Sequence, residues 1–457
     1  MSSLYLAFSA ICVTVLKELN ALVDEPYMDE PFHIPQVQAY CRGEFETWDP
    51  KLTTPPGLYL MSLLLKKIFL FKCNVPMLRL TATLNLLGLP LALTWLLCYH
   101  QRVRSPTSWF TPSNEAVVVA FFPVAWFFGF LYYTEAPSLL SVILTVVFAS
   151  QSNHWLAALF GLISCTFRQT NVIWMLYAYA SSQLMMLRFK RPSNHDSESK
   201  NRLHDPSALQ GAPMDLVKSI LDVPKILPQV LPAFIPYTLV LGLFAAFVIW
   251  NGGIVLGDKS NHVPTVHIPQ IYYFVGFTTI LGWPILLSYQ GGPGALVKDV
   301  AYRTFGSKVR SLISLVIMGA MGVTVKLFTI HHPFLLSDNR HYTFYVWRRV
   351  FLLHPFAPYL LVPGYFACAW AWFLRAGRDQ TLLQNLLLPV FVIPTLLPTP
   401  LLEPRYFLIP YILLRAQIGD VPAWAVALEG VWYGLINGLT MYIFLYLPRE
   451  GVGRFMW

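Results

Sequence analysis

Long apolar runs recur along the whole of this 457-residue chain, and they limit its possible folds more than any other feature. A run of about 18 residues or more can cross the hydrocarbon core of a bilayer, which is roughly 30 Å thick. Backbone polar groups need partners inside lipid, and these runs do not alternate polar with apolar residues, so they predict helices rather than barrel strands. The expected fold class is an all-α polytopic membrane protein, with one membrane-embedded domain over residues 1–457.

The composition supports a membrane protein and argues against a nucleic-acid partner. Hydrophobic residues make up 56% of the chain and charged residues only 12%, whereas an ordinary soluble domain carries about 25% charged residues. The net charge of +9 comes mostly from Lys and Arg in short stretches between apolar runs, which orientation in a membrane explains. The first run, Leu4 to Leu16, lacks a basic flank and a convincing cleavage site, so we expect a retained helix in contact with membrane lipid.

The apolar runs predict about twelve membrane crossings, plus or minus two. The stretch 57–72 is interrupted by Lys66 and Lys67 and is a candidate for lying along the membrane surface. The expected helices lie at about 3–23, 76–99, 115–132, 136–150, 153–167, 171–188, 228–250, 270–289, 311–330, 350–374, 381–400 and 422–447.

The loops between these helices differ in charge on the two sides of the membrane. With a cytosolic N-terminus, the Lys- and Arg-rich loops 100–105, 189–227, 290–310 and 375–380 all lie in the cytosol. The longest, 189–227, is expected to be a flexible linker. The opposite side receives nearly every unusual polar cluster, and because ionisable groups near lipid are costly, these clusters predict a polar cavity at that face.

The cysteines predict neither a disulfide framework nor a metal site. None has CxxC or zinc-ligand spacing, and several lie within apolar runs, so a Cys41–Cys73 bridge is considered but not expected. No metal ligands and no cofactor are expected. The six cysteines are Cys12, Cys41, Cys73, Cys98, Cys165 and Cys368.

The first polar cluster, "YMDEPFH", follows the first apolar run and contains Asp29, Glu30 and His33. Prolines on both sides predict a rigid, irregular loop, and Asp49 follows in "TWDPKL". A carboxylate held in this way can act as a general base on a hydroxyl group. The alternative is a pair of solvated acids that cap the helix end.

The second cluster, "SDNRHYTFYVWRR", contains Asp338, Asn339, Arg340, His341 and Tyr342 within a polar loop over 331–349. Arginine suits an anionic phosphate because its planar fork donates two parallel hydrogen bonds. The alternative, an Asp–Arg surface pair beside aromatic membrane anchors, fits the second half of the run better than the first.

Five shorter motifs add candidates on the same side. Four of them have a structural alternative: an ion pair for "EPRYF", loop charge for "GDKSNH", a helix N-cap for "YTEAPS" and a snorkelling arginine in "FRQTN"; the fifth is "HHPF". Their candidate residues are Arg405, Lys259, His332, Glu135, Gln169 and Asn171.

Taken in order, these motifs resemble a known family. "PYMDEPFHIPQVQAYC", "WDPKLTTPPGLY", "FLYYTEAPS", "FRQTNVIW", "GDKSNH", "HPFLLSDNRHYTFYVWRR" and "EPRYF" are similar to those of the dolichyl-phosphoglucose-dependent alpha-1,2-glucosyltransferases of the endoplasmic reticulum. The similarity spans residues 26 to about 407.

The resemblance implies a GT-C glycosyltransferase fold in the endoplasmic reticulum membrane, with a lumenal active site whose catalytic acid motif lies in the first lumenal loop, 24–75. It implies dolichyl phosphate glucose as donor and a diglucosylated dolichyl-pyrophosphate oligosaccharide as acceptor. Asp29 or Glu30 is then the catalytic base, with inversion at the transferred sugar. The expected donor-phosphate ligands are Arg405, Arg340, Lys259 and His332, and the expected sugar-binding residues are His33, Asp49, Glu135, Gln169, Asn171, Asp338, Asn339, His341 and Tyr342.

Two other classes of function remain open from the residues alone. A transporter of a lipid-linked sugar or an ion is weakened by the absence of recognisable inverted repeats. A non-catalytic scaffold in the same membrane would tolerate the loss of Asp29 and of the arginines.

Overall fold

The computed structural model describes residues 2–189, 203–259 and 264–457. Over these ranges the chain forms helices, with isolated β-bridges and no strand, which confirms the all-α prediction. Six helical segments among the described residues are long and apolar enough to cross a membrane. They are Ser3–Leu22, Val75–Gln101, Pro213–Asn251, Pro269–Leu287, Lys308–Phe328 and Ala357–Gly377.

The chain divides into two compact units. Unit 1 comprises Met1–Ala120, Phe128–Val263 and Gln380–Phe391. Unit 2 comprises Phe121–Phe127, Pro264–Asp379 and Val392–Trp457.

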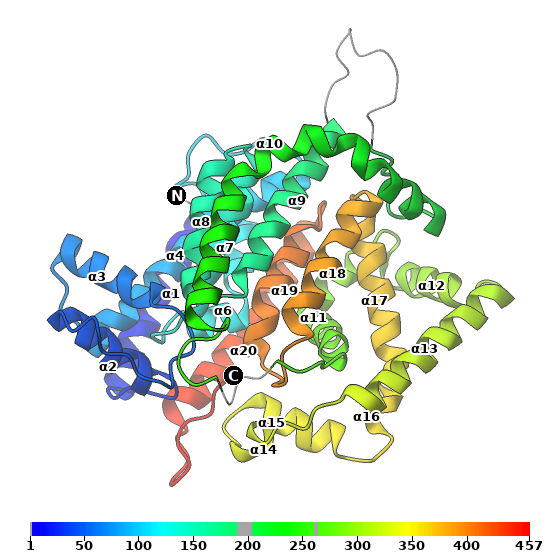
Figure 1. Cartoon of the computed structure of the whole chain (residues 1–457). Coiled ribbons are helices and arrows are strands. Elements are labelled where there is room, and N and C mark those ends of the chain that lie inside the picture. The colour runs from blue at the N-terminus through cyan, green and yellow to red at the C-terminus, as the bar shows by residue number, and fades with distance from the viewer. Residues whose placement is uncertain (1, 190–202, 260–263) are drawn as a thin grey trace. The chain divides into compact units, whose positions relative to one another are not determined.

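Unit 1 is built around α7, which packs on α4, α8 and α9 and is buried around most of its circumference (Figure 1). A helix that is apolar on all sides fits such a central place. The helices of unit 1 are α1 (Ser3–Leu22), α2 (Glu30–Arg42), α3 (Gly57–Phe69), α4 (Val75–Gln101), α5 (Asn114–Ala120), α7 (Glu135–Ser150), α8 (His154–Phe167), α9 (Asn171–Phe189) and α10 (Pro213–Asn251).

Unit 2 centres on α11, which packs against α17 and α20. Helix α6 (Pro123–Phe128) lies almost wholly in unit 2, and α18 (Leu382–Leu396) begins in unit 1 and ends in unit 2. The other elements are α11 (Pro269–Leu287), α12 (Gly292–Phe305), α13 (Lys308–Phe328), α14 (Phe334–Ser337), α15 (Tyr342–Val346), the π-helix η1 (Trp347–Phe351), α16 (Ala357–Leu360), α17 (Val362–Gly377), the 3-10 turn η2 (Pro404–Phe407), α19 (Leu408–Ala416) and α20 (Ala423–Tyr446).

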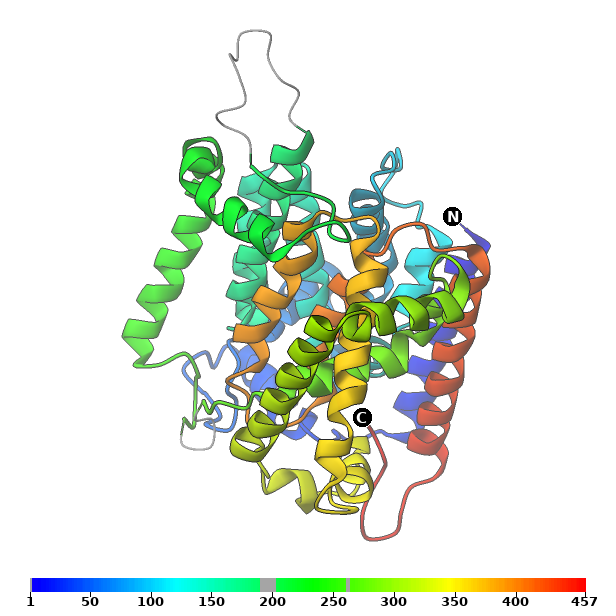
Figure 2. The same ribbon diagram turned by 90° about the vertical axis from the view of Figure 1, so that its right-hand side faces the viewer.

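Helix α10 is longer than predicted, and it shortens the expected flexible loop 189–227. Its helical turns start at Pro213, where the Asp215 carboxylate accepts the Ala212 N–H at 2.9 Å. Four prolines at a spacing of four residues each remove an internal hydrogen bond, which favours curvature, and α10 curves visibly in Figure 1 and Figure 2. Residues 190–202 of the expected loop lie outside the described residues.

One other expectation about helices is wrong. The run 115–132 forms two short helices, α5 and α6, because Pro123 cannot continue the first one. The segment 24–75, predicted as the first lumenal loop, contains α2 and α3, and α3 covers most of the stretch 57–72.

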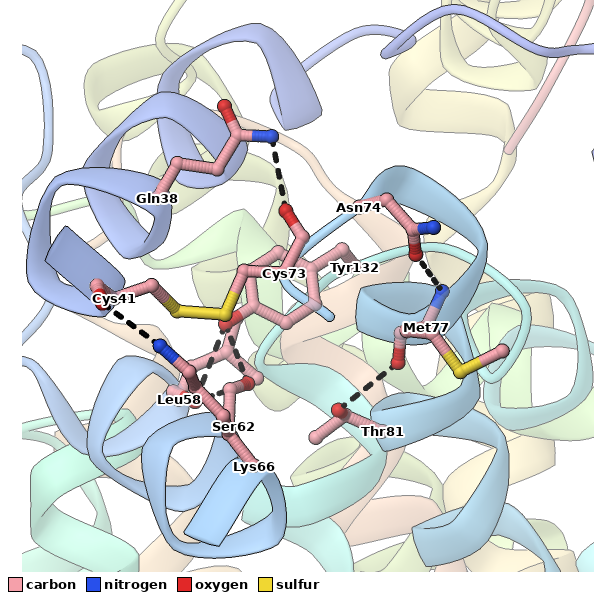
Figure 3. Close-up of a disulfide and its surroundings, with 10 residues drawn as sticks. All are labelled: Gln38, Cys41, Leu58, Ser62, Lys66, Cys73, Asn74, Met77, Thr81 and Tyr132. Atoms are coloured by element: carbon pink, nitrogen blue, oxygen red, sulfur yellow. Dashed lines mark hydrogen bonds between the residues drawn. A yellow bond between two sulfur atoms is a disulfide. The ribbon is translucent and has the colours of Figure 1, made fainter. Parts of the chain in front are cut away.

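A disulfide joins Cys41, in the last turn of α2, to Cys73, just before α4 (Figure 3). The prediction that no such bridge forms is therefore wrong. The sequence spacing of 32 residues carries no signature, but the turns between α2, α3 and α4 bring the two Cα atoms to 6.6 Å, within the usual range for a disulfide. Lys66 Nζ donates to the Cys41 carbonyl at 2.8 Å and Gln38 Nε2 to the Cys73 carbonyl at 3.1 Å, so both cysteines are also held by hydrogen bonds.

Candidate active site

Asp29 lies at a strained turn in unit 1, directly before α2. The preceding residue, Met28, has φ +60°, a left-handed conformation that is uncommon for a residue with a side chain. The Asp29 amide donates to the hydroxyl of Tyr133 at 2.9 Å, and the Asp29 carbonyl accepts the His33 N–H at 3.2 Å. The irregular loop predicted around this motif therefore ends at Asp29, and its half-buried carboxylate stands at the N-terminus of a helix, where negative charge is favoured.

Glu30 is fully buried and forms an ion pair with Arg79 of α4, also fully buried. Arg79 Nε and Nη2 donate to the two Glu30 oxygens at 2.9 and 2.6 Å. The amides of Tyr27 and Tyr132 add bonds of 3.0 and 2.8 Å. Because the Glu30 carboxylate already accepts four hydrogen bonds, accepting a substrate proton would disrupt this network, and the geometry favours Asp29 as the base.

Arg79 also holds the end of α1. Its Nη1 donates to Asn20 Oδ1 at 3.2 Å and to the Val23 carbonyl at 2.5 Å, and its Nη2 donates to the Glu25 carbonyl at 3.0 Å. All five N–H donors of the guanidinium are thus used. The sequence analysis did not select Arg79, although an arginine inside an apolar run is itself a signal for a buried partner.

His33 lies on α2, and Asp49 is hydrogen-bonded to that helix. His33 Nδ1 lies 2.7 Å from the hydroxyl of Tyr59, and its ring centroid lies 6.2 Å from that of Tyr133. The Asp49 amide donates to Gln36 Oε1 at 2.9 Å. Three predicted site residues are therefore positioned by α2: Asp29 precedes it, His33 lies on it, and Asp49 bonds to it.

Glu135 and Arg168 form an ion pair between the first turn of α7 and the end of α8. Glu135 is therefore not a simple N-cap, and Arg168 does not simply snorkel. Asn171 is buried, and its Nδ2 donates to Ser138 Oγ at 2.7 Å and to the Ser164 carbonyl at 2.8 Å. These contacts join α7, α8 and α9.

The loop 50–53 contacts two segments that carry further candidates, Gln169 and Lys259. Gln169 Nε2 donates to the Thr53 carbonyl at 2.7 Å, and the Asp258 amide donates to the Pro50 carbonyl at 2.7 Å. Lys259 follows on an exposed position and donates to the carbonyl of Asn251, at the end of α10. The segment that carries Lys259 thus packs on the segment that follows Asp49.

The second cluster lies in unit 2, between α14 and α15. Arg340 binds Asp338 through Nη2 at 2.6 Å and Nε at 2.9 Å, and both side chains are about a quarter exposed. His341 Nε2 lies 3.5 Å from the same carboxylate. Partial burial alone would raise the pKa of Asp338, but hydrogen bonds from Arg340 and the nearby positive charges lower it overall. The pair is thus partly open to solvent.

The segment 454–457 packs against this cluster, which the sequence analysis did not foresee. The Met456 amide donates to the Arg340 carbonyl at 2.8 Å, and His341 Nδ1 lies 2.5 Å from the Trp457 carbonyl oxygen. The Tyr342 hydroxyl lies 2.9 Å from Thr440 Oγ1 of α20. Asn339 contributes its carbonyl, which accepts from Arg449 at 3.2 Å. Much of the loop 338–342 is therefore held through its backbone.

Arg405 repeats the arrangement of Arg340. Its Nη2 binds Glu403, two residues earlier, at 2.6 Å, and both side chains are about one fifth exposed. The preceding segment is tied to the start of α11, where Gln270 Nε2 donates to the Leu401 carbonyl at 2.7 Å. His332 lies two residues before α14, and its Nδ1 accepts the Phe334 N–H at 3.3 Å. Within the ranges that the structure covers, no three His, Cys, Asp or Glu side chains form a group that could hold a metal ion.

Comparison with known proteins gives one consistent result. The sequence profile of the DIE2/ALG10 family matches residues 23–416. A human protein named "Dol-P-Glc:Glc(2)Man(9)GlcNAc(2)-PP-Dol alpha-1,2-glucosyltransferase" is 35% identical over 452 residues, covering 95% of this chain and 93% of its own. A protein of the same name from Arabidopsis thaliana is 32% identical, with 96% of each chain covered. Another from Drosophila melanogaster is 34% identical, covering 91% of this chain and 89% of its own. No solved structure matches the chain. The chain belongs to the DIE2/ALG10 family.

Proposed function

We infer that this chain is a dolichyl-phosphoglucose-dependent alpha-1,2-glucosyltransferase. It transfers glucose from dolichyl phosphate glucose to the terminal glucose of the diglucosylated dolichyl-pyrophosphate oligosaccharide, the last step in assembling the precursor for protein N-glycosylation. The observation that carries this inference is that animal and plant relatives, at 32–35% identity over nearly the whole chain, all bear this activity in their names. The half-buried acid and the two open arginines supply chemistry that the reaction needs.

The proposed location is the endoplasmic reticulum membrane, with the active site on the lumenal side and a GT-C fold. Two arguments support the sidedness. The predicted order of crossings puts the Lys- and Arg-rich loops on the opposite side from the polar motifs. The Cys41–Cys73 disulfide closes the segment that follows Asp29, and disulfides persist in oxidising compartments such as the endoplasmic reticulum lumen.

Asp29 is the proposed base. It removes the proton from the 2-hydroxyl of the acceptor's terminal glucose while that oxygen attacks the anomeric carbon of the donor. The bond from this carbon to the phosphate oxygen breaks, and dolichyl phosphate leaves with the electron pair. Attack opposite to the leaving group inverts a beta-linked donor to an alpha product. A phosphate leaves as a stable anion, so one base suffices where inverting glycosidases use two carboxyl groups.

Arg340 and Arg405 are the proposed ligands of the donor phosphate, with Lys259 and His332 as secondary ligands. Each arginine keeps a carboxylate partner two residues earlier, so its charge is balanced when no donor is bound. Both pairs are partly exposed, and a bidentate guanidinium can bind phosphate while its charge stabilises the departing oxygen. These side chains take the role that a divalent cation has in other transferases, and the proposed reaction needs no metal.

The proposed sugar ligands are the polar groups around these centres. His33 and Asp49 are placed by α2, and Asp338, Asn339, His341 and Tyr342 lie around Arg340. Glu135, Gln169 and Asn171 already hold protein groups, so their part in sugar binding is to shape the loops that contact the glycan.

A mass measurement tests the proposed function directly. The purified protein, reconstituted with dolichyl phosphate glucose and the diglucosylated lipid-linked acceptor, should lengthen the glycan by one hexose. Glycosidase digestion should identify the new linkage as alpha-1,2. Movement of labelled donor across a bilayer without a longer glycan would instead support transport. Full activity after exhaustive chelation supports the metal-free reaction, and recovery only with Mg²⁺ or Mn²⁺ contradicts it.

A further inference from the structure

The amide of Asp29 depends on a side chain from another part of unit 1. The first N–H groups of a helix have no partner within the helix, and the same holds for the residue that precedes it. Here the partner is the hydroxyl of Tyr133, 2.9 Å away. The Tyr133 side chain is 2% exposed, and its ring lies beside Phe128 and His33, at 5.2 and 6.2 Å between centroids.

Two consecutive tyrosines hold two consecutive acids. The Tyr132 amide donates to the Glu30 carboxylate at 2.8 Å, while the Tyr133 hydroxyl accepts from the Asp29 amide. The segment 129–133 is itself anchored to α4, because Thr83 Oγ1 donates to the Gly129 carbonyl at 2.9 Å. The turn before α2 is therefore held by a segment that is itself bonded to α4. These bonds offset the unfavourable left-handed conformation of Met28.

We propose that Tyr133 is a positioning residue for the catalytic base: its hydroxyl fixes the backbone of Asp29 and thereby the direction of the Asp29 carboxylate. This inference rests on the proposed role of Asp29. Tyr133 acts through Asp29 and is not assigned a contact with the reacting atoms. A base displaced by about 1 Å reacts up to roughly a hundredfold more slowly, so a lost hydroxyl here has a catalytic cost beyond its structural one.

The neighbouring tyrosine provides a matched control. Tyr132 is equally buried, and its hydroxyl lies 2.7 Å from Ser62 Oγ, away from Asp29. Tyr133→Phe and Tyr132→Phe each remove one buried hydroxyl from adjacent rings. Tyr133→Phe should lower kcat about tenfold to a hundredfold and leave the KM values for donor and acceptor within about twofold. Tyr132→Phe should keep a near-native kcat, and its melting temperature should fall by about as much as that of Tyr133→Phe.

Equal loss of kcat in the two variants, at equal melting temperature, would overturn the positioning role. A second comparison asks whether Tyr133 acts through Asp29. In an Asp29→Asn background, Tyr133→Phe should change the residual rate by less than about twofold, since coupled residues are not additive. The same drop as in the native background would place Tyr133 elsewhere in the mechanism. Failure of the base assignment is separate, because it would appear as a near-native rate in Asp29→Asn alone.

Discussion

The Glu30–Arg79 pair of unit 1 and the Asp338–Arg340 pair of unit 2 have the same chemistry and opposite environments. Both members of the first pair are completely buried, and all five guanidinium donors of Arg79 are used. Both members of the second pair are about a quarter exposed. The two pairs therefore differ in burial: Arg79 is enclosed and binds backbone carbonyls, whereas Arg340 is partly accessible to solvent.

The physical reason is the cost of desolvation. A buried ion pair is held because removing either partner leaves an uncompensated charge without water, whereas a partly exposed pair loses little when it opens. The buried pair also restrains the turn that precedes Asp29, the proposed base. The partly exposed pairs of unit 2, Asp338–Arg340 and Glu403–Arg405, contain the proposed phosphate ligands. Five predictions follow this division, from the largest expected effect to the smallest.

Asp29→Asn should reduce kcat by about 10²–10⁴, because a general base contributes that much and the amide cannot accept the proton. The measurement is transfer from the lipid donor by the purified, folded variant. Asp24→Asn removes an exposed carboxylate from the same turn and should keep near-native activity. A near-native rate in Asp29→Asn would show that Asp29 is not the base.

Arg79→Met should lower the stability of the protein by about 3–5 kcal/mol, since it strands the buried Glu30 carboxylate. Arg340→Met, the matched change in the open pair, should cost at most about 1 kcal/mol. Denaturation in detergent micelles measures both. Equal losses would show that exposure does not distinguish the two pairs.

Cys41→Ser should destabilise unit 1 by about 2–4 kcal/mol, because the disulfide limits the unfolded chain. A reducing agent should have a similar effect on the native protein and none on the variant. Cys368→Ser, which removes a free cysteine of unit 2, is the control and should behave like the native protein. A free thiol titration that finds Cys41 and Cys73 reduced in protein isolated from the membrane would contradict the bridge.

Arg405→Ala and Arg340→Ala should each raise the KM for the lipid donor about tenfold, because a charge-assisted bond to phosphate is lost. The KM for the acceptor should change less. Arg348→Ala removes an exposed arginine that lies over the ring of Phe344 and serves as the control. If one variant shows an unchanged KM for the donor, the phosphate-binding role belongs to the other arginine.

The smallest effect concerns pH. The pKa of Asp338 is lowered in the folded protein, so its ionised form stabilises the fold above the unfolded carboxyl pKa of about 4. This contribution should disappear as the pH falls below that value through the folded pKa. Because the pair is partly exposed, the change should stay below about 1 kcal/mol. Melting curves of native protein and Asp338→Asn should converge at acidic pH, and parallel curves would contradict the contribution.

The sequence alone selected the candidate site residues, whereas the contacts that hold them could not be predicted from it. The order of the motifs indicated the family, and the resemblance then pointed to Asp29, Arg340 and Arg405 as candidates. The helical class followed from the apolar runs. The choice between Asp29 and Glu30 depended on Arg79, which lies 49 positions after Glu30 and belongs to no predicted motif. The role of Tyr133 depended on a bond across 104 positions.

The sequence by itself determined that this protein is helical and membrane-embedded, because apolar run length and the need to satisfy backbone groups in lipid are local properties. It also determined where the polar motifs lie along the chain. Only the tertiary structure decided that α2 is a helix, that Cys41 meets Cys73, and that one acid is saturated while its neighbour is half-exposed. Those outcomes depend on which distant side chains reach each other, and pairing at long sequence separation leaves no periodic signal in the residues themselves.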